Sequence, residues 1–213
     1  GTEEQQEEWL KPLLAGEIRS AFGMTEPGVA SSDATNMAAT AVLDGDEYVI
    51  NGEKWWTSGA GDPRCKIIIF MCVTDQDPES PRHKRHSMIL VPRDTKGIET
   101  RKMMEVFGWD DAPHGHAHLK FENVKVPKEN RIGEDGFGFK FAMKTLSGGR
   151  IGIAAQALGV ASGALELALQ YSKERKSFGK PICEHQAIQL KLADMATRVE
   201  AARLLTESAA QAY

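Results

Sequence analysis

A sharp bend in the first part of the chain constrains its fold and function most. Residues Phe22–Ser32 read FGMTEPGVASS, a short apolar run that ends in Thr-Glu-Pro-Gly and is followed by two serines. Pro27 fixes one backbone angle and Gly28 tolerates an unusual one, so we predict a chain reversal here. Beyond the bend, small residues leave backbone N–H groups and the hydroxyls of Ser31 and Ser32 free to converge on an anion such as a phosphate.

A tryptophan-rich stretch, residues 51–61 with the sequence NGEKWWTSGAG, offers a surface for a flat ring. In a strand, Trp56 and Ser58 would point to one face and Trp55 and Thr57 to the other, because successive side chains alternate. An aromatic plane beside a hydroxyl donor, near a phosphate cradle, indicates a bound dinucleotide with a large ring. We expect Trp55, on the opposite face, to be packed in the core.

Length and composition are those of an ordinary globular protein. The 213 residues can bury a sizeable core, with 41% hydrophobic and 26% charged residues. A formal net charge of −4 argues against non-specific nucleic-acid binding, which needs a basic surface. The three cysteines show no CxxC spacing, which favours a reducing compartment over a disulfide framework. The apolar run at residues 151–169 is interrupted by polar residues and favours a packed helix over a transmembrane segment.

The pattern from Ala21 to Ile132 is that of a β domain. Asn51-Gly52 lies between two strand-like runs and predicts a hairpin turn. Apolar or alternating runs predict further strands at residues 66–73, 87–91 and 118–127. Many short strands separated by turns indicate an antiparallel barrel or sandwich.

Helical patterns flank this β domain. Thr2 and Gln5 have the spacing of a capping box, which opens a short helix that Gly16 ends. After a glycine-rich connector at residues 133–138, apolar residues recur at helical spacing from Ile151 to Leu169 and from Ile188 to Leu205. Gly179 is expected to end the first long helix and Pro181 to bar its continuation, which predicts an antiparallel helical hairpin. The fold class is therefore α+β.

Four sequence blocks in a fixed order, MTEPG with SSD, NGEKWW-TS, ERKSFGK and EHQ, resemble the acyl-CoA dehydrogenase family of flavoenzymes. The resemblance covers nearly the whole chain. It implies that residues 1–20 end an N-terminal helical domain, residues 21–133 form a middle β domain that binds FAD and acyl-CoA, and residues 134–213 start a C-terminal helical domain. The implied reaction is α,β-dehydrogenation of an acyl-CoA thioester, in which a carboxylate removes the α-proton while hydride passes to flavin N5.

The same resemblance implies the site residues. FAD would be bound by the bend, by the tryptophan-rich stretch and, from a neighbouring subunit, by the turn between the two long helices. These residues are Phe22, Gly23, Met24, Thr25, Gly28, Ser31, Ser32, Trp56, Thr57, Ser58, Arg175, Lys176, Ser177, His185 and Gln186. Acyl-CoA would be contacted by Ser32, by Ser147 and by Arg150, which we expect at the start of the first long helix.

The glutamate that serves as base in the family has no counterpart in this sequence. In most members it lies further along than Tyr213, and in some it precedes the arginine at the helix start, where this chain has Gly149. We therefore assign no catalytic residue and expect these residues alone to bind pieces of cofactor without turnover. The resemblance further implies an electron-accepting flavoprotein partner, a homo-oligomer (dimer or tetramer), and the mitochondrial matrix or the bacterial cytoplasm.

Three other functions stay open. An acyl-CoA oxidase shares the four blocks and differs in letting oxygen reach the reduced flavin. A flavin- or CoA-binding assembly module would keep the fold without catalysis. A metal-binding β protein could use His114, His116 and His118, which would share one strand face, but no Cys or carboxylate motif completes such a site and we predict no metal. The length and branching of the acyl group also stay open.

Overall fold

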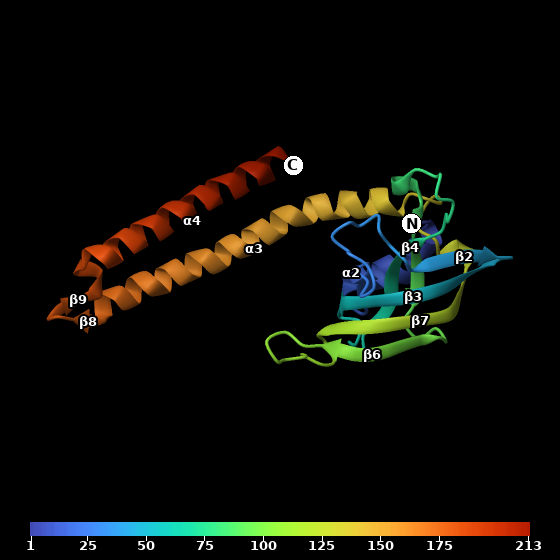
Figure 1. The fold of residues 1–213 in the computed structure, drawn as a ribbon, viewed down its shortest axis with the longest axis horizontal. Coiled ribbons are helices and arrows are strands. Elements are labelled where there is room, and N and C mark those ends of the chain that lie inside the picture. The colour runs from blue at the N-terminus through green and yellow to red at the C-terminus, as the bar shows by residue number, and fades with distance from the viewer. The chain divides into compact units, whose positions relative to one another are not determined.

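The computed structural model describes residues 1–213, which divide into two compact units, Gly1–Ala142 and Met143–Tyr213. Seven strands of the first unit form one sheet. They are β1 (Arg19–Gly23), β2 (Thr40–Asp44), β3 (Glu47–Ser58), β4 (Cys65–Val73), β5 (His86–Pro92), β6 (Ile98–Met104) and β7 (His116–Pro127). Their order is β1-β4-β2-β3-β7-β6, with β5 paired to β4 (Figure 1).

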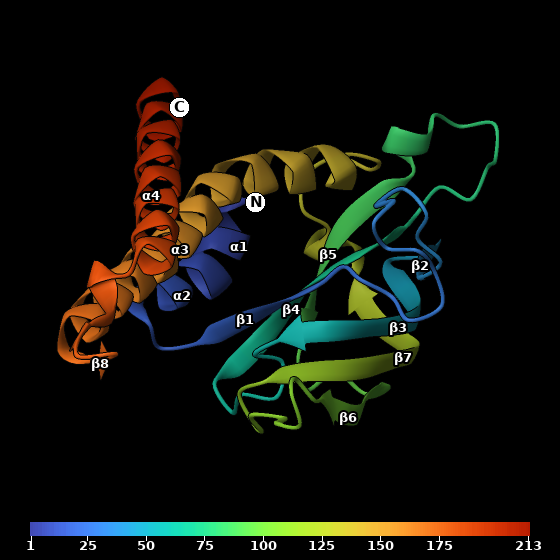
Figure 2. The same ribbon diagram turned by 60° about the vertical axis from the view of Figure 1, so that its left-hand side comes forward.

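The sheet is mixed and curves into a half-barrel (Figure 2). Four pairings are antiparallel, as predicted: β2–β3, β3–β7, β4–β5 and β6–β7. The pairing of β1 with β4 is parallel, and so is the single contact of β2 with β4 at Thr40 and Val73. The α+β class and the predicted strands at 66–73, 87–91 and 118–127 are confirmed, while β2 and β6 were not anticipated individually.

The hairpin predicted at Asn51-Gly52 is wrong. Strand β3 runs straight through these residues, and the turn lies at Gly45, which has a φ of 63° and joins β2 to β3. Gly52 instead has a φ of 144° beside a register shift against β7. A Cβ atom there would lie 2.5 Å from the Cβ atom of Ala39. The glycine therefore permits a β-bulge and a close approach of two chain segments rather than a turn.

Side chains from the strands of this curved sheet form the core of the first unit. Phe70 of β4 and Phe121 of β7 are fully buried, with ring centroids 4.5 Å apart. Ile50, Ile89 and Leu119 are buried in the same cluster. The core thus joins strands that lie far apart in the sequence.

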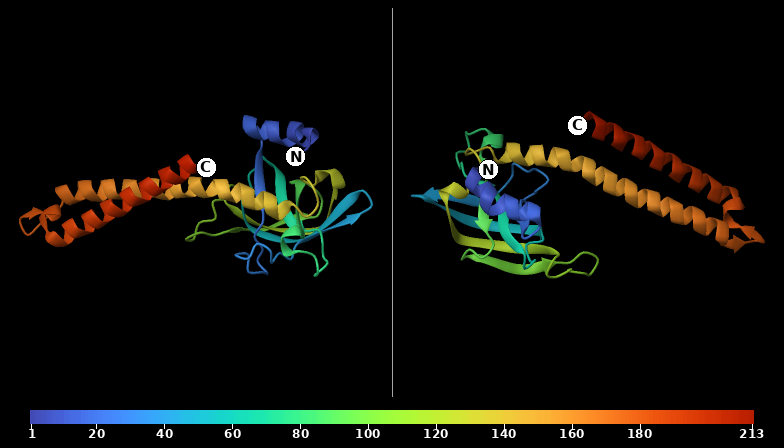
Figure 3. Two further views of the ribbon diagram at one scale, coloured as in Figure 1. Left: turned by 90° about the horizontal axis from the view of Figure 1, so that it is seen from above. Right: turned by 180° about the vertical axis from the view of Figure 1, so that it is seen from behind.

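A short N-terminal helical segment lies against β4 and β5 of the sheet (Figure 3). It comprises α1 (Glu3–Gln5), the π-helix η1 (Gln6–Leu10) and α2 (Lys11–Ala15). The predicted capping box is confirmed, because Thr2 Oγ1 accepts from the Gln5 amide and Gln5 Oε1 accepts from the Thr2 amide. Gly16, with a φ of 77°, ends the segment as predicted.

The second unit contains two long helices that run antiparallel, as predicted (Figure 1). Helix α3 (Gly138–Glu174) begins at the end of the first unit, and α4 (Gln186–Ala212) follows the short strands β8 (Lys176–Ser177) and β9 (Lys180–Pro181) and the 3-10 helix η4 (Ile182–Glu184). Two further 3-10 helices of the first unit are η2 (Arg82–Lys84) and η3 (Lys128–Asn130). Helix α4 buries none of its residues.

Two predictions about this unit are wrong. Gly179 does not end α3, which stops at Glu174; Phe178 and Gly179 have φ angles of 51° and 80° and form the two-residue turn between β8 and β9. Arg150 does not start a helix, because α3 begins at Gly138. The apolar periodicity is clear only from Ile151 onward, so the first part of α3 escapes prediction. The end of α3 is misplaced because the segment after it folds as a short β-hairpin.

Candidate functional site

The bend and the tryptophan-rich stretch lie side by side. The Trp55 amide donates to the Thr25 carbonyl at 3.1 Å, and Thr25 Oγ1 donates to the Trp55 carbonyl at 2.8 Å. These two hydrogen bonds fix the bend against the end of β3. The two stretches that the sequence assigned to one site therefore form one surface.

A buried ion pair locks the same two segments together. Lys54 Nζ lies 2.7 Å from Glu26 Oε1, with the lysine side chain 0% and the glutamate 4% exposed. The ammonium also donates to the Met24 carbonyl at 3.0 Å. The Glu26 carboxylate accepts from the amides of Ala38 and Ala39 at 2.7 and 3.0 Å. Every charged group here has partners, as a buried charge requires.

The ion pair is embedded in an apolar environment. Burial lowers the pKa of the Lys54 ammonium, and the Glu26 carboxylate opposes this change. The amine lies 5.0 Å from the centroid of the Phe70 ring. Burial also raises the pKa of the Cys72 thiol to about 12, so this cysteine is unreactive. Sequence reasoning missed the pair, although both partners lie inside the highlighted blocks, T-E-P and G-E-K-W.

The bend does not offer all the groups that we predicted. Ser31 Oγ accepts from the Glu26 amide at 2.9 Å and donates to the Glu26 carbonyl at 3.3 Å, so the prediction of a free hydroxyl is wrong for Ser31. Ser32 is exposed. Gly28 is not among the residues with positive φ, so Pro27 and these hydrogen bonds shape the bend. Of the remaining predicted residues, Phe22 is exposed, Gly23 is buried and Met24 and Thr25 are partly buried.

A β-bulge changes the arrangement of the two tryptophans. Trp56 has a φ of 52°, and the register against β7 shifts between Lys54 and Thr57. The two indole rings consequently lie 6.2 Å apart, and Trp55 is only partly buried, so its predicted place in the core is wrong. Thr57 takes that place: it is fully buried, and its Oγ1 has no hydrogen-bond partner.

The exposed side of the bulge carries an aromatic and hydroxyl surface, as predicted. Trp56 is 40% exposed and Ser58 is exposed beside it. His116 of β7 joins them: its Nδ1 lies 2.8 Å from Ser58 Oγ and its ring lies 5.8 Å from the indole of Trp56. Sequence reasoning had considered His116 only as a metal ligand. The pairing of Ser58 with His116 across β3 and β7 gives it this position.

The other two histidines of the H-G-H-A-H segment have separate partners. His114 Nδ1 lies 3.1 Å from Asp62 Oδ2, and His118 Nε2 lies 2.9 Å from Glu53 Oε2. No group of three or more Cys, His, Asp or Glu side chains converges anywhere in the chain. The segment therefore braces the sheet and its loops through three separate contacts.

The second unit gathers the residues that the sequence assigned to the turn between the long helices. Ser177 Oγ lies 3.2 Å from His185 Nε2, and His185 immediately precedes the first residue of α4, Gln186. Arg175 and Lys176 are exposed next to them. Phe178, which sequence reasoning passed over, is 97% exposed at the tip of this turn, with its ring edge-on to His185 at 6.1 Å.

The predicted substrate residues of α3 share one helix face. Ser147 and Arg150 are three residues apart and both exposed, so their side chains emerge on the same side. A Cβ atom on the intervening Gly149 would meet nothing within 4 Å. This part of α3 is an open helix surface.

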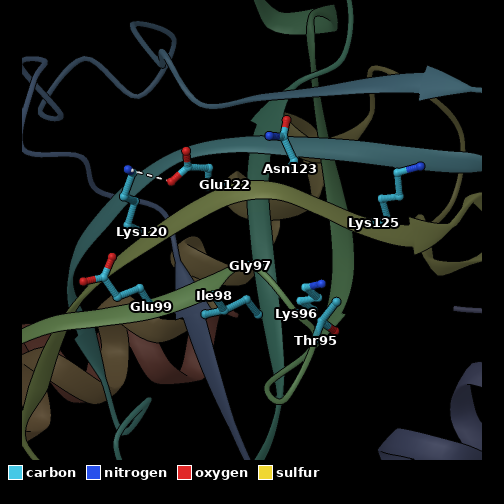
Figure 4. A pocket seen from close by; sticks show the side chains of 9 residues that line it. All are labelled: Thr95, Lys96, Gly97, Ile98, Glu99, Lys120, Glu122, Asn123 and Lys125. Atoms are coloured by element: carbon cyan, nitrogen blue, oxygen red, sulfur yellow. Dashed lines mark hydrogen bonds and ion pairs between the residues drawn. The ribbon is translucent and has the colours of Figure 1, made fainter.

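An open hollow of about 610 Å³ lies over β6 and β7, away from the bend (Figure 4). It is lined by Thr95, Lys96, Gly97, Ile98, Glu99, Lys120, Glu122, Asn123 and Lys125. Lys120 Nζ lies 2.8 Å from Glu122 Oε2, and the remaining charges are of both signs. The hollow contains no predicted site residue and offers no converging chemistry.

Comparison with known proteins identifies the family of this chain. A model of the acyl-CoA dehydrogenase middle domain matches residues 21–124, and one of the acyl-CoA dehydrogenase C-terminal domain matches residues 136–213. The chain belongs to the acyl-CoA dehydrogenase family. Members of this family are flavoprotein oxidoreductases that act on acyl-CoA substrates and oligomerise.

Two curated relatives illustrate the similarity. The chain is 50% identical over 210 residues to FadE2 of Mycobacterium tuberculosis, which is described as a probable acyl-CoA dehydrogenase. The matched region covers 99% of this chain and 51% of that protein. It is 48% identical over 207 residues to acyl-CoA dehydrogenase family member 11 of Gallus gallus, covering 97% and 26%. The chain thus spans about half or less of the length of these relatives.

Solved structures share the fold. Butyryl-CoA dehydrogenase from Megasphaera elsdenii superimposes with a TM-score of 0.85 at 42% identity, covering 98% of this chain and 52% of that one. A glutaryl-CoA dehydrogenase in complex with glutaryl-CoA gives 0.87 at 36% identity, covering 99% and 51%. A chain in a structure described as the electron transferring flavoprotein of Acidaminococcus fermentans gives 0.86 at 43% identity, covering 99% and 53%.

Proposed function

We propose that this chain is the flavin-binding part of an FAD-dependent acyl-CoA dehydrogenase, which introduces an α,β double bond into an acyl-CoA thioester. The observation that carries the proposal is that two of the four family blocks, the bend and the tryptophan-rich stretch, are hydrogen-bonded to each other. Thr25 of the bend is hydrogen-bonded to Trp55, immediately beside the exposed surface formed by Trp56, Ser58 and His116. Family membership supports the reaction class.

The residues of this surface fit an isoalloxazine ring. A flavin needs an apolar face and polar groups near its ring nitrogens to tune its electronics. The exposed indole of Trp56 supplies the face, and Ser58 Oγ, held by His116, supplies a hydroxyl of defined position. The bulge at Trp56 holds this residue at a strained positive φ and turns its indole outward. This strain does not improve the packing of the core, which supports a functional role for the exposed indole.

The bend would hold the pyrophosphate with fewer hydroxyl groups than the sequence suggested. Ser31 already donates to the Glu26 carbonyl, so we assign the anion contacts to backbone N–H groups of the bend and to the exposed Ser32. The buried Glu26–Lys54 pair keeps this backbone in place.

The second unit would supply the remaining contacts. Arg175, Lys176, Ser177, His185 and Gln186 are proposed to bind the FAD of a neighbouring subunit, and the exposed Phe178 adds an aromatic surface to this group. Guanidinium and amide groups suit phosphate oxygens and an adenine edge. Ser32, Ser147 and Arg150 are the proposed contacts to acyl-CoA.

Bound FAD would supply the hydride acceptor. The polypeptide would orient the thioester, exclude water from the indole surface and stabilise the charge that develops on the thioester carbonyl. We assign no base within the 213 residues. The electrons would leave to a partner flavoprotein, and the protein would work as a homo-oligomer.

Substitution of Trp56 tests the proposal. In the full-length protein, Trp56→Ala should lower the FAD retained after gel filtration, measured from the flavin absorbance per polypeptide. Trp109→Ala, which removes another exposed indole, should leave the FAD content unchanged. A wild-type protein without flavin bands, or equal FAD retention in the Trp56 variant, would contradict the proposal.

A further inference from the structure

Strand β7 carries a histidine, His116, whose backbone is fixed from both sides. It pairs with Ser58 of β3 on one side and with Met104 of β6 on the other (Figure 1). The next residue along the strand, Ala117, is fully buried, so the side chain of His116 points away from the core. The imidazole is therefore held on the outer face of the sheet, directly across from Ser58.

The imidazole makes two different contacts on that face. Its Nδ1 atom lies 2.8 Å from Ser58 Oγ, and its ring centroid lies 5.8 Å from that of Trp56. Ser58 is exposed, whereas His116 is only partly exposed. The hydroxyl that the proposed function places beside the flavin thus has a histidine behind it.

The direction of this hydrogen bond decides what Ser58 presents to a bound molecule. A hydroxyl has one hydrogen and two acceptor lone pairs, and a neutral imidazole has one N–H group and one bare nitrogen. If Nδ1 is bare, it accepts the hydrogen of Ser58, and only the lone pairs of the oxygen face outward. If Nδ1 carries the hydrogen, Ser58 accepts it and keeps its own hydrogen to donate.

The chemistry of the two groups favours the first arrangement. An imidazole nitrogen is more basic than an alcohol oxygen, so the stronger hydrogen bond has Ser58 Oγ donating to His116 Nδ1. The hydrogen of the ring then lies on Nε2, where water can accept it because His116 is partly exposed. Ser58 is left as a hydrogen-bond acceptor toward the surface of Trp56.

We propose that His116 is a positioning residue that makes Ser58 an acceptor toward the flavin and thereby favours the reduced ring. This inference rests on the proposed function, which places the ring on Trp56. The ring nitrogen that receives the hydride is bare in the oxidised flavin and carries an N–H group in the reduced one, which needs an acceptor. Tighter binding of the reduced ring raises the midpoint potential and so favours removal of hydride from the acyl group.

The midpoint potential of the flavin in the full-length, FAD-loaded protein tests this inference. His116→Phe keeps an aromatic ring against Trp56 but frees Ser58 to donate to the oxidised ring. It should lower the potential by about 30 mV, a tenfold loss in the preference for the reduced ring in a two-electron couple. His116→Asn, whose amide oxygen can accept in place of Nδ1, should keep this preference within twofold of wild type.

Two controls separate this role from packing. In a Ser58→Ala background, His116→Phe should leave the potential unchanged, because His116 acts through the hydroxyl. His118→Asn should also leave it unchanged, since it breaks only the 2.9 Å contact with Glu53 Oε2 on the same strand. The inference is overturned by an unchanged or raised potential in His116→Phe, or by an equal effect of this substitution without the Ser58 hydroxyl.

A measurement without cofactor tests the direction of the hydrogen bond even if a variant loses its flavin. Solid-state nitrogen-15 NMR of the flavin-free, full-length protein, labelled at histidine, distinguishes a bare ring nitrogen from an N–H group. The Nδ1 resonance of His116, assigned by its loss in His116→Asn, should be that of a bare nitrogen and should move in Ser58→Ala. A hydrogen on Nδ1, or a resonance that ignores the loss of the hydroxyl, would refute the arrangement.

Failure of the proposed function gives a different result. A wild-type protein without flavin bands would remove the ring and this inference with it. A wild type that holds flavin, together with a His116→Phe variant of equal potential, would refute the role of His116 alone.

Discussion

The two units of the molecule use apolar residues in opposite ways. The first unit buries a continuous cluster between strands that are distant in sequence, and it even encloses a lysine and a glutamate. The second unit exposes large apolar side chains along both helices. These include Ile153, Val160, Leu167, Leu190, Leu204 and Leu205. The first unit therefore has a hydrophobic core of its own, whereas α3 and α4 expose apolar faces of the kind that pack against other surfaces.

The exposure of α3 invites a second interpretation. By length and composition alone, α3 could cross a membrane, a weak indication because core helices of soluble proteins meet the same criterion. Residues 136–213 match the acyl-CoA dehydrogenase C-terminal domain, and the family oligomerises. We therefore propose that α3 and α4 are bundle helices that other helices cover.

Breaking the buried ion pair should lower the free energy of unfolding more than any other change, and only for the first unit. Lys54→Met would leave the Glu26 carboxylate buried without its cation, at a cost of about 3–5 kcal/mol in the free energy of unfolding. Urea denaturation followed by tryptophan fluorescence measures this change. The double variant with Glu26→Gln should recover part of the loss, and a double variant no more stable than the single one would contradict the role of the unpaired charge.

Two glycines allow a sharper comparison, because they should respond in opposite directions. Gly52→Ala would push a Cβ atom against Ala39 at a φ of 144° and should destabilise the first unit by about 1–3 kcal/mol. Gly159→Ala lies within α3, where a Cβ atom meets nothing within 4 Å, and should stabilise the helix by roughly 0.5–1 kcal/mol. Thermal unfolding followed by circular dichroism measures both. Destabilisation by Gly159→Ala would show that another helix packs against that position.

Acid should weaken the first unit through His86. This side chain is 1% exposed, neither ring nitrogen has a hydrogen-bond partner, and burial lowers its pKa, with the charge of Arg85 acting in the same direction and Lys54 adding less. The unfolded chain therefore takes up the proton first. Stability should fall, by at most about 1.4 kcal/mol per pH unit, as the pH drops below the ordinary histidine pKa of about 6.5 and until it passes the lowered value.

The backbone groups of Thr35 and Arg82 approach this ring and oppose the lowering of its pKa. Urea midpoints between pH 8 and pH 5 for wild type and His86→Phe check the assignment. A variant whose midpoint depends on pH as steeply as that of wild type would exclude His86 as the source.

The smallest effect is expected on the exposed face of α4. Leu205→Ser alters a side chain with little to lose, so the stability of this chain should change by less than about 0.5 kcal/mol. Denaturant titration of the helical signal is the measurement. A larger loss would mean that Leu205 is already covered, for example by a second copy of the chain, and dilution would then lower the stability further.

The sequence predicted best those features that depend on neighbouring residues. The capping box at Thr2 and Gln5, the end of the first helical segment at Gly16 and the strand near residues 66–73 follow from local rules and are confirmed. The two long helices follow from their periodicity. The joining of the bend to the tryptophan-rich stretch was predicted only through a functional interpretation of both.

What escaped prediction depends on contacts between distant segments. The bulge at Trp56 is a matter of register against β7, and the place of Gly52 depends on Ala39. The pairing of Glu26 with Lys54 joins residues that are 28 positions apart. The site residues of the helical turn stay predictions, because they need a partner surface for their function.

The burial of Lys54 also offers a way to measure how often the bend opens. An amine-reactive reagent cannot reach the Lys54 ammonium while Met24, Glu26 and the Phe70 ring surround it. Each labelled Lys54 would therefore register one opening of the bend, and a pulse of reagent followed by mass spectrometry would time those openings with and without cofactor.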